Sequence, residues 1–460
     1  MKTILSLFSF LFAFCFLTQS CKNTNKENSN IEKNNTNIIS VAAKPPMGWN
    51  SYNCFGGNVT EEEMKQNADY MATYLKPYGW EYVVLDFLWY CDDQSSAEKF
   101  QNRRPFQYID QYGRLIPSPK LHPSSINGKG LKPLGDYIHN KGLKFGIHIM
   151  RGIPRQAIEK NAPVLGSNLT AAQIANINDT CIWYGGLTGV NMSVEGAQSY
   201  YNSLLKLYAE WGVDYIKVDD IAYPYHADEI EAVAEAIKNC GRPIVLSLSP
   251  GPAPLGNIRH LRNHANLWRI SADFWDNWKQ LLQQLDLCRQ WAPLVTEGHW
   301  PDADMLPLGR LKIRHETAGA KDHYTYFTKD EQYFMMTLWA IFRSSLMIGG
   351  NLPDNDEFTL SLLTNPDIIQ VNQNSTNNKE LSFENGISIW TANDKTNPVT
   401  YIAFLNTTDQ VQEFSYSTDK AGKNNPCQIK DLWKKQNVPF QGNTFKISLP
   451  AHGASIYSIN

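Results

Sequence analysis

WGVDYIKVD, residues 211–219, is a short β-rich run that ends in a carboxylate. A stretch with the apolar spacing of a helix, Asp228 to Lys238, follows it. The same alternation begins at Lys44, and residues 60–75 form another such helical stretch with three Glu near its start. Short β-rich runs separated by amphipathic helices are typical of βα units that build a parallel sheet.

Eight β-rich runs occur in this alternation. They are Met47–Tyr52, Tyr82–Phe87, Lys144–Ile149, Tyr215–Asp220, Ile244–Ser249, Leu267–Ser271, Pro293–Glu297 and Ser345–Gly350. Eight βα repeats are what a TIM barrel requires, so we predict an α/β fold with a (β/α)8 barrel.

A different pattern begins after Asn372, where short alternating runs are broken by Asn, Asp and Gly. The runs are Ile387–Trp390, Thr400–Leu405, Val411–Tyr416 and Thr444–Ile447. They predict a C-terminal antiparallel β-sandwich domain. We therefore divide the chain into a signal segment (1–21), an Asn-rich tether (22–43), the barrel (44–373) and the sandwich (374–460).

The N-terminal segment is typical of an exported protein. Lys2 precedes an apolar run, Ile4 to Leu17, that is too short to span a bilayer, and Ser20-Cys21 follows. A small residue before a Cys in this position resembles a bacterial lipobox, so we expect Cys21 to become a lipidated N-terminus. The alternative is ordinary cleavage nearby. We expect a location in the periplasm or on the outer membrane or cell surface.

The composition excludes some classes of partner. The 460 residues carry 42 Lys+Arg and 45 Asp+Glu, a formal charge of −3, so no polyanion-binding surface and no nucleic-acid partner are expected. Beyond Cys15 and Cys21, six scattered Cys remain without CxxC spacing, which disfavours a zinc site. A membrane contact is expected only through the lipid anchor. The oligomeric state cannot be predicted.

Two connections between the predicted strands are too long for simple turns. They are residues 92–123 and 152–195, after the second and third runs. Loops at this end of barrel strands build active sites, so we predict that both wall a substrate pocket. The alternative is an insertion without function.

Carboxylates recur where barrel strands end. Asp219 closes the fourth run, and Lys217 lies two residues earlier on the same face of the strand. Asp273 follows the sixth run. A neighbouring ammonium group keeps a carboxylate ionised and nucleophilic. Two carboxyl groups facing each other across a barrel mouth suit glycoside hydrolysis, although a helix cap or loop ion pair explains either one alone.

Seven blocks, in unbroken order from Lys44 to Gln373, resemble glycoside hydrolase family 27, the α-galactosidase family. The blocks are PPMGWNSY (45–52), the segment 86–89, GLKFGI (142–147), WGVDYIKVD (211–219), Trp268-Arg269 with Asp273, WPDADML (300–306) and LWAIFRS (338–344). The resemblance implies a barrel with a C-terminal β-sandwich and a retaining double displacement without metal or organic cofactor.

The resemblance also implies roles for individual residues. Asp219 corresponds to the nucleophile and Asp273 to the acid/base. Lys217 and Arg269 match cationic positions beside the sugar. Tyr52, Asp86 and Asp304 match positions that contact the sugar or shape its pocket. For Asp304 a structural cap is an equal alternative.

The sequence departs from the family at the sugar pocket. Phe87 replaces the second of two consecutive Asp, Ser249 lies near the position where many members have Glu, and His148 stands where Tyr is common. An apolar residue at position 87 removes an anchor for the C6 hydroxyl of galactose. The chain is therefore expected to be an exo-acting α-galactosidase or a β-L-arabinopyranosidase, since arabinopyranose has the same hydroxyl pattern without C6.

Other functional classes have less support. A glycan-binding protein without activity would not need all of Asp219, Asp273, Lys217 and Arg269. A nucleotide-dependent enzyme would need a GxGxxG or GxxxxGK[ST] motif, and the sequence has neither. The expected partner is a carbohydrate.

Overall fold

The computed structural model describes residues 41–92, 105–315, 317, 319–424 and 426–460. The predicted signal segment, Cys21 and the tether up to residue 40 lie outside these residues. Ala42 is buried, and Trp300 Nε1 donates a hydrogen bond of 2.8 Å to its carbonyl. Among the described residues, no helix is long and apolar enough to cross a membrane.

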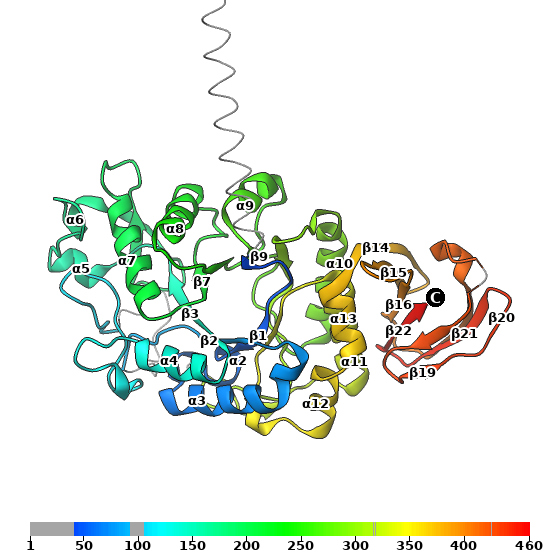
Figure 1. The fold of residues 1–460 in the computed structure, drawn as a ribbon. Coiled ribbons are helices and arrows are strands. Elements are labelled where there is room, and N and C mark those ends of the chain that lie inside the picture. The colour runs from blue at the N-terminus through cyan, green and yellow to red at the C-terminus, as the bar shows by residue number, and fades with distance from the viewer. Residues whose placement is uncertain (1–40, 93–104, 316, 318, 425) are drawn as a thin grey trace, which may run out of the picture.

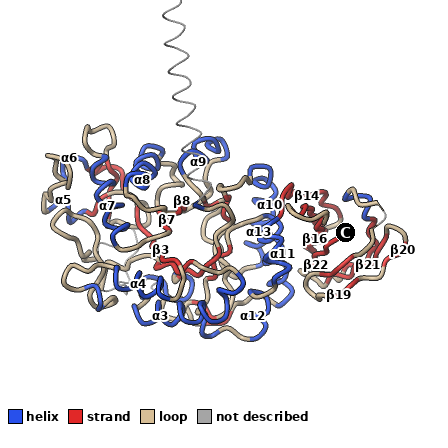
Figure 2. The backbone as a smooth tube through the Cα atoms, viewed as in Figure 1, coloured by secondary structure: helices blue, strands red, loops and turns tan. Residues whose placement is uncertain are grey.

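A ring of eight parallel strands forms the centre of the larger domain (Figure 2). The strands are β1 (Met47–Asn50), β2 (Tyr82–Leu85), β3 (Lys144–Met150), β7 (Tyr215–Asp219), β8 (Val245–Leu248), β9 (Leu267–Arg269), β10 (Trp300–Asp302) and β13 (Leu346–Ile348). Their order in the sheet is β10-β9-β8-β7-β3-β2-β1-β13. A parallel bridge between Leu306 and Ile348 joins the segment after β10 to β13. The predicted barrel is confirmed.

Helices surround this sheet (Figure 1). Their bounds are α2 (Tyr52–Phe55), α3 (Glu61–Tyr70), α4 (Lys132–Asn140), α5 (Arg155–Glu159), α6 (Ala171–Ile174), α7 (Gln198–Glu210), α8 (Ala227–Asn239), α9 (Ile258–His264), α10 (Trp278–Trp291), α11 (Lys329–Phe342), α12 (Glu357–Leu363) and α13 (Pro366–Asn374). Acidic residues lie in the first turns of α3 and α8, as the helix dipole favours. In α3, Thr60 and Glu63 also form a capping box.

The seventh predicted strand, Pro293–Glu297, is wrong. Residues 292–294 form a 3-10 helix, and the strand is β10. Its central residue, Pro301, disfavours a strand prediction because proline cannot donate to a ladder. Trp300 N donates a hydrogen bond to Asn266 O on the side of β9. Successive residues of a strand direct their backbone N–H groups to opposite sides, so Pro301, which has no N–H group, lacks a donor on the side away from β9. There β10 has no strand partner among the described residues.

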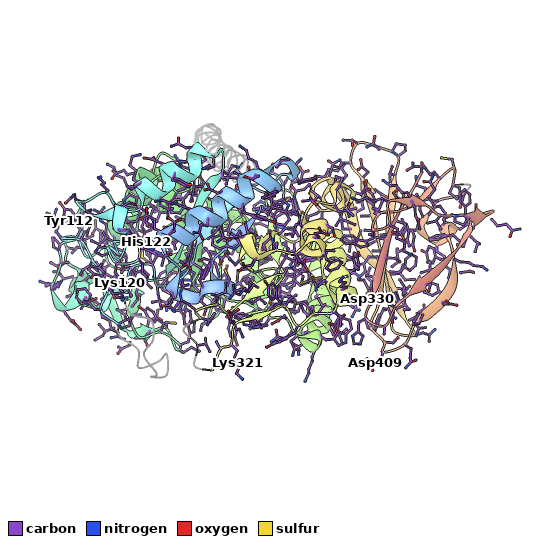
Figure 3. All side chains as sticks on the ribbon, turned by 90° about the horizontal axis from the view of Figure 1, so that it is seen from below. Tyr112, Lys120, His122, Lys321, Asp330 and Asp409 are labelled. Atoms are coloured by element: carbon purple, nitrogen blue, oxygen red, sulfur yellow. The ribbon has the colours of Figure 1, made fainter. Side chains whose placement is uncertain are left out.

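The insertion after β3 contains a small sheet of its own. It has the order β4-β6-β5, from β4 (Ile153–Pro154), β5 (Ala175–Thr180) and β6 (Leu187–Val190). The described part of the loop after β2 braces it, because Gln107 Nε2 donates a hydrogen bond of 3.0 Å to Tyr184 Oη. In Figure 3, Tyr112 and Lys120 of this loop lie at the end of the molecule opposite Asp409 of the C-terminal domain.

Two antiparallel sheets form the C-terminal domain, as predicted. The larger has the order β14-β15-β16-β22-β18-β19 and the smaller β17-β21-β20. Their bounds are β14 (Ser375–Glu384), β15 (Ile387–Asp394), β16 (Thr400–Asn406), β17 (Gln412–Ser417), β18 (Ile429–Asp431), β19 (Gln436–Asn437), β20 (Phe440–Gln441), β21 (Thr444–Leu449) and β22 (Ala454–Ile459). Phe404 of one sheet and Tyr416 and Phe445 of the other pack in a shared core. A short hairpin in the larger domain pairs β11 (Arg310–Leu311) with β12 (His323–Tyr324).

Candidate active site

A cavity of about 510 Å³ lies at the carboxyl ends of the barrel strands. Seven of the residues predicted to form the site line it: Tyr52, Asp86, Phe87, Lys217, Asp219, Asp273 and Asp304. Because these residues come from five different strand ends or the segments after them, the barrel brings together side chains that are far apart in the sequence.

Asp86 and Lys217 form a buried ion pair at the cavity wall. Asp86 Oδ2 lies 3.1 Å from Lys217 Nζ and accepts a hydrogen bond of 2.7 Å from Asn50 Nδ2. Burial raises the pKa of Asp86, but Lys217, His148 and the hydrogen bonds from Phe87 N and Asn50 outweigh it and hold the pKa well below its ordinary value. Asp86 is therefore ionised and acts as a fixed acceptor.

Asp219 lies at the end of β7 and is held by His148 of β3. His148 Nε2 lies 3.1 Å from Asp219 Oδ2, and Asp220 N donates a hydrogen bond of 2.9 Å to Oδ1. Burial raises the pKa of Asp219, yet His148, Lys217 and the Asp220 N–H together lower it below its ordinary value. The carboxylate is therefore ionised, oriented and in contact with the cavity.

A network of ion pairs around Arg151 lies next to Asp219 in the sequence, at Asp220. Arg151 Nη2 contacts Asp220 Oδ2 at 2.8 Å, and Arg151 also pairs with Asp179 and Glu229. Burial raises the pKa of Asp220 to about 6 although Arg151 opposes the shift. Sequence analysis missed this network because Arg151 has no partner close in sequence.

Asp273 is the exposed carboxylate of the site. It lies in the loop after β9, its side chain is 61% exposed, and its Oδ1 is 3.4 Å from Arg269 Nη2. The same Nη2 is 2.6 Å from Asp304 Oδ2, which also accepts a hydrogen bond of 2.7 Å from Phe274 N. Burial raises the pKa of Asp304 to about 6 against the effect of Arg269. Arg269 thus connects an exposed carboxylate with a buried one.

Phe87 lines the cavity beside Asp86 and is only 2% exposed. Its ring makes edge contacts with His148, Trp183 and Tyr184, at centroid distances of 5.4, 5.6 and 5.1 Å. Turning the ring away from the cavity would displace at least one of these rings. Since His148 also holds Asp219, the orientation of Phe87 is coupled to the candidate nucleophile.

Three predicted site residues lie behind the lining of the cavity. His148 contacts Asp219 and Phe87, and Arg269 contacts Asp273 and Asp304, so both act on the site through other residues. Ser249 is buried, and the residues that follow it, 250–252, line the cavity instead.

Several lining residues were not predicted. They are Asn53, Ile182, Trp183, Tyr223, Pro250, Gly251, Pro252, Ala272, Phe274, Trp275, Met305, His315 and Thr317. Most lie in loops, where no periodic pattern marks a residue for function. One signal was available, because Ile182-Trp183-Tyr184 is an apolar cluster inside a long polar loop. Of the described residues in the connection 92–123, none lines the cavity, so its predicted role as a wall is not seen there.

The arrangement suits acid/base and nucleophilic chemistry on a polyhydroxylated ring. Asp219 and Asp273 both reach the cavity, Lys217 places a positive charge at its wall, and Tyr52 with Trp275 supplies aromatic surface for C–H groups. Groups with metal-binding spacing occur among the described residues at Glu231-His260-His264 and Asp179-His226-Glu229, and no member of either lines this cavity.

Comparison with known proteins gives a consistent result. Residues 182–374 match the family description "Alpha galactosidase A", and residues 384–459 match "Alpha galactosidase C-terminal beta sandwich domain". The solved structure of a GH27 β-L-arabinopyranosidase from Geobacillus stearothermophilus is 48% identical, with a TM-score of 0.88 over 92% of this chain and 98% of that one.

Curated relatives are more distant. Alpha-galactosidase 2 of Arabidopsis thaliana is 28% identical over 76% of this chain and 72% of its own length. An α-galactosidase of Cyamopsis tetragonoloba is 25% identical over 90% of this chain and 85% of its own.

Proposed function

This chain belongs to glycoside hydrolase family 27 and is a glycoside hydrolase, and from that premise we propose that it removes terminal β-L-arabinopyranosyl residues from oligo- or polysaccharides. The observation that carries the proposal is Phe87, which is fixed at the position where galactosidases of this family have a carboxylate. The relative at 48% identity that is named a β-L-arabinopyranosidase supports it.

Phe87 acts on specificity through the C6 hydroxyl group. A site that hydrogen-bonds a substrate hydroxyl rejects the analogue lacking it by roughly 10⁴–10⁵, whereas an apolar pocket rejects an added hydroxyl by only about 10². The phenyl ring offers no acceptor, so a galactoside would lose a hydrogen bond and leave its hydroxymethyl group against apolar surface. An arabinopyranoside has no such group.

Asp219 is the proposed nucleophile. Its ionised oxygen attacks the anomeric carbon as the bond to the leaving oxygen breaks, and Asp273 gives that oxygen a proton. Water then attacks the glycosyl-enzyme ester, Asp273 takes a proton from the water, and Asp219 leaves as a carboxylate. The position of Asp273 supports its role, because its side chain lines the cavity and is 61% exposed, so both the leaving oxygen and the incoming water can reach it.

The remaining lining residues hold the sugar in this proposal. The ion pair of Asp86 and Lys217 lies where both groups can reach ring hydroxyls, and Tyr52 presents a ring to the cavity. A cavity of about 510 Å³ suits a terminal sugar, so we expect monosaccharide as the product. Cleavage that released oligosaccharides without monosaccharide would contradict this mode of action.

Phe87→Asp tests the specificity. We expect kcat/KM for an aryl α-D-galactopyranoside to rise relative to that for an aryl β-L-arabinopyranoside, by about tenfold or more. Ile182→Asp is the matched control, because it adds the same charge to an exposed residue of the same cavity and should leave the ratio nearly unchanged. A ratio that Phe87→Asp does not move would contradict the role of Phe87.

The second candidate function is α-D-galactosidase activity. Asp86, Lys217 and Asp304 are compatible with it, since none of them distinguishes the two sugars, and the two α-galactosidases reported above, at 28% and 25% identity, support it. Galactosides hydrolysed faster than arabinopyranosides by the unaltered enzyme would support it.

Export and lipid attachment at Cys21 are part of the proposal. The support is the sequence alone, a basic residue and an apolar run before Ser20-Cys21. Labelling cells with radioactive palmitate should mark the wild-type protein and leave Cys21→Ser unlabelled. Equal labelling of the two proteins, or labelling of neither, would contradict lipid attachment at this residue.

A further inference from the structure

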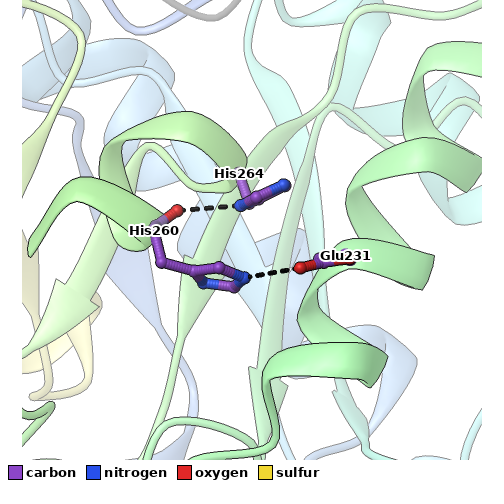
Figure 4. A group of neighbouring side chains, drawn as sticks. All are labelled: Glu231, His260 and His264. Atoms are coloured by element: carbon purple, nitrogen blue, oxygen red, sulfur yellow. Dashed lines mark hydrogen bonds and ion pairs between the residues drawn. The ribbon is translucent and has the colours of Figure 1, made fainter. Parts of the chain in front are cut away.

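Glu231 of α8 and His260 and His264 of α9 form a cluster outside the catalytic cavity (Figure 4). One ring nitrogen of each His and one carboxylate oxygen of Glu231 all lie within 4.8 Å of one another. The two His are four residues apart, so they share one face of α9, and their ring centroids are 4.3 Å apart.

Hydrogen bonds fix both imidazole rings. His264 Nδ1 lies 2.8 Å from the carbonyl oxygen of His260. A carbonyl only accepts, so Nδ1 carries the proton and Nε2 of the neutral ring keeps its lone pair.

His260 is held at both ring nitrogens. Its Nδ1 lies 2.7 Å from Tyr225 Oη, and its Nε2 lies 3.0 Å from Glu231 Oε1. Metal-binding His residues in proteins are oriented in this way, by a partner on the nitrogen that does not bind the metal. In the described structure Nε2 donates to the Glu231 carboxylate; when a metal takes the place of that proton, the neutral ring carries its proton on Nδ1 and Tyr225 Oη accepts it, so Tyr225 has the position of such an orienting partner.

We propose that Glu231, His260 and His264 bind a divalent transition metal of the zinc type. Two imidazole nitrogens and one carboxylate oxygen are a donor set that zinc accepts, with a further position left for water. Oxygen-preferring Ca²⁺ and Mg²⁺ suit these donors less well. Zinc binding requires the three donor atoms, which lie within 4.8 Å of one another, to move closer together, and the 56% exposed side chain of Glu231 has room to adjust its position.

The surroundings leave room for a metal. Glu231 and His264 line a surface pocket of about 480 Å³ together with Ser193, Asp228, Glu235 and Lys238, and Lys238 pairs with Glu235 at 3.4 Å. The other group with metal-binding spacing is different, because Arg151 contacts both Asp179 and Glu229, at 2.9 and 2.7 Å. Its guanidinium already supplies the positive charge there, so that group carries no proposal.

A bound metal would connect two helices that follow loops of the catalytic cavity. Tyr223 lines the cavity just before α8, and Pro250 to Pro252 line it before α9. Tying α8 to α9 would restrict the relative movement of both loops. The proposal therefore predicts that the metal stabilises the folded barrel.

Calorimetric titration with ZnCl₂ tests the site on the full chain purified without a polyhistidine tag. We expect about one zinc ion to bind per chain, and Glu231→Gln and His264→Ala to weaken binding by about tenfold or more. Glu235→Gln is the control, because it removes the same charge from the same helix beside the same pocket and should bind as the wild type does.

Thermal unfolding gives an independent measurement. Zinc should raise the Tm of the wild type and of Glu235→Gln, and should leave the Tm of Glu231→Gln nearly unchanged. Glu231 is exposed, so its substitution is compatible with folding. The proposal would be overturned if the wild type showed no saturable uptake, or if Glu231→Gln and His264→Ala bound zinc as tightly as the wild type.

Discussion

Asp219 and Asp273 carry the same side chain but lie in different surroundings. Asp219 is enclosed by His148, Lys217 and a backbone N–H that keep it ionised, whereas Asp273 lies in a loop with most of its side chain in water. In the proposed mechanism the ionised Asp219 attacks, and Asp273 is accessible to both the leaving oxygen and the incoming water.

The proposed role of Asp273 can be tested with two leaving groups. In Asp273→Ala, hydrolysis of an alkyl β-L-arabinopyranoside should fall by about 10²–10⁴, because its leaving oxygen needs a proton. A dinitrophenyl glycoside leaves without one, so its first step should change little and a burst of dinitrophenol should appear in stopped-flow measurements.

Asp304→Asn is the comparison, because Asp304 shares Arg269 with Asp273 but is buried. It should slow both substrates to a similar extent. If Asp304→Asn instead showed the leaving-group dependence and Asp273→Ala did not, the acid/base role would belong to Asp304.

His148 allows a prediction about pH. Asp219 must be ionised to attack, so activity is lost as pH falls through its pKa, which lies below the ordinary value of 3.8 in the wild type. His148→Leu removes a hydrogen bond and a positive charge while burial remains, so the pKa of Asp219 should rise.

The acidic limb of the kcat/KM profile should therefore move to higher pH in His148→Leu. In His148→Gln, which keeps a hydrogen-bond donor, it should move less. An acidic limb at the same pH in all three proteins would show that His148 does not control Asp219.

At the scale of elements, strand ends were predictable and loop positions were not. Seven of the eight barrel strands match predicted runs, because buried parallel strands are apolar and bounded by helical patterns. β10 was missed since Pro301 interrupts that pattern. Asp219 and Lys217 were found because their position along the strand determines where they point, whereas Asp86 was found only through the resemblance to the family.

The cavity residues that lie in loops could not be predicted from their position along a strand. Trp183 reaches the cavity only because the sheet of β4, β5 and β6 positions its loop, and Tyr223 and Trp275 likewise come from irregular segments. The Arg151 network and the contacts of Phe87 depend on tertiary packing between distant segments. A single sequence does not reveal which distant loops will meet.

The insertion after β3 is predicted to support specificity. Trp183→Ala removes one of the rings packed against Phe87, so Phe87 gains freedom to turn. The ratio of galactoside to arabinopyranoside kcat/KM should then rise, by less than about tenfold because no acceptor for the C6 hydroxyl is added. Phe106→Ala, an exposed aromatic outside the cavity, should leave the ratio unchanged. A lower ratio in Trp183→Ala would argue against this support.

At the scale of the whole molecule, α11 makes several of the contacts between the barrel and the C-terminal domain. Trp433 of the C-terminal domain donates a hydrogen bond of 2.8 Å to Thr337 Oγ1 and packs on Tyr333, with ring centroids 4.8 Å apart. His452 contacts Glu331 at the start of the same helix and stacks on Trp278. These contacts couple the sandwich to the helix that follows β10 in the barrel.

Trp433→Ala should therefore weaken the whole protein. Loss of a half-buried Trp with its hydrogen bond is expected to lower the free energy of unfolding by about 2–3 kcal/mol, measured by urea titration. Phe440→Ala, an exposed aromatic in the same domain, should change it by less than about 0.5 kcal/mol. Equal effects of the two variants would contradict coupling through α11.

The central claim is that Phe87 makes this family 27 enzyme prefer a sugar without C6. The most direct test is kcat/KM of the unaltered enzyme for an aryl β-L-arabinopyranoside and an aryl α-D-galactopyranoside with the same leaving group. We predict a clear preference for the arabinopyranoside. A preference for the galactoside would show that Phe87 only lines the cavity and that other groups hold the C6 hydroxyl.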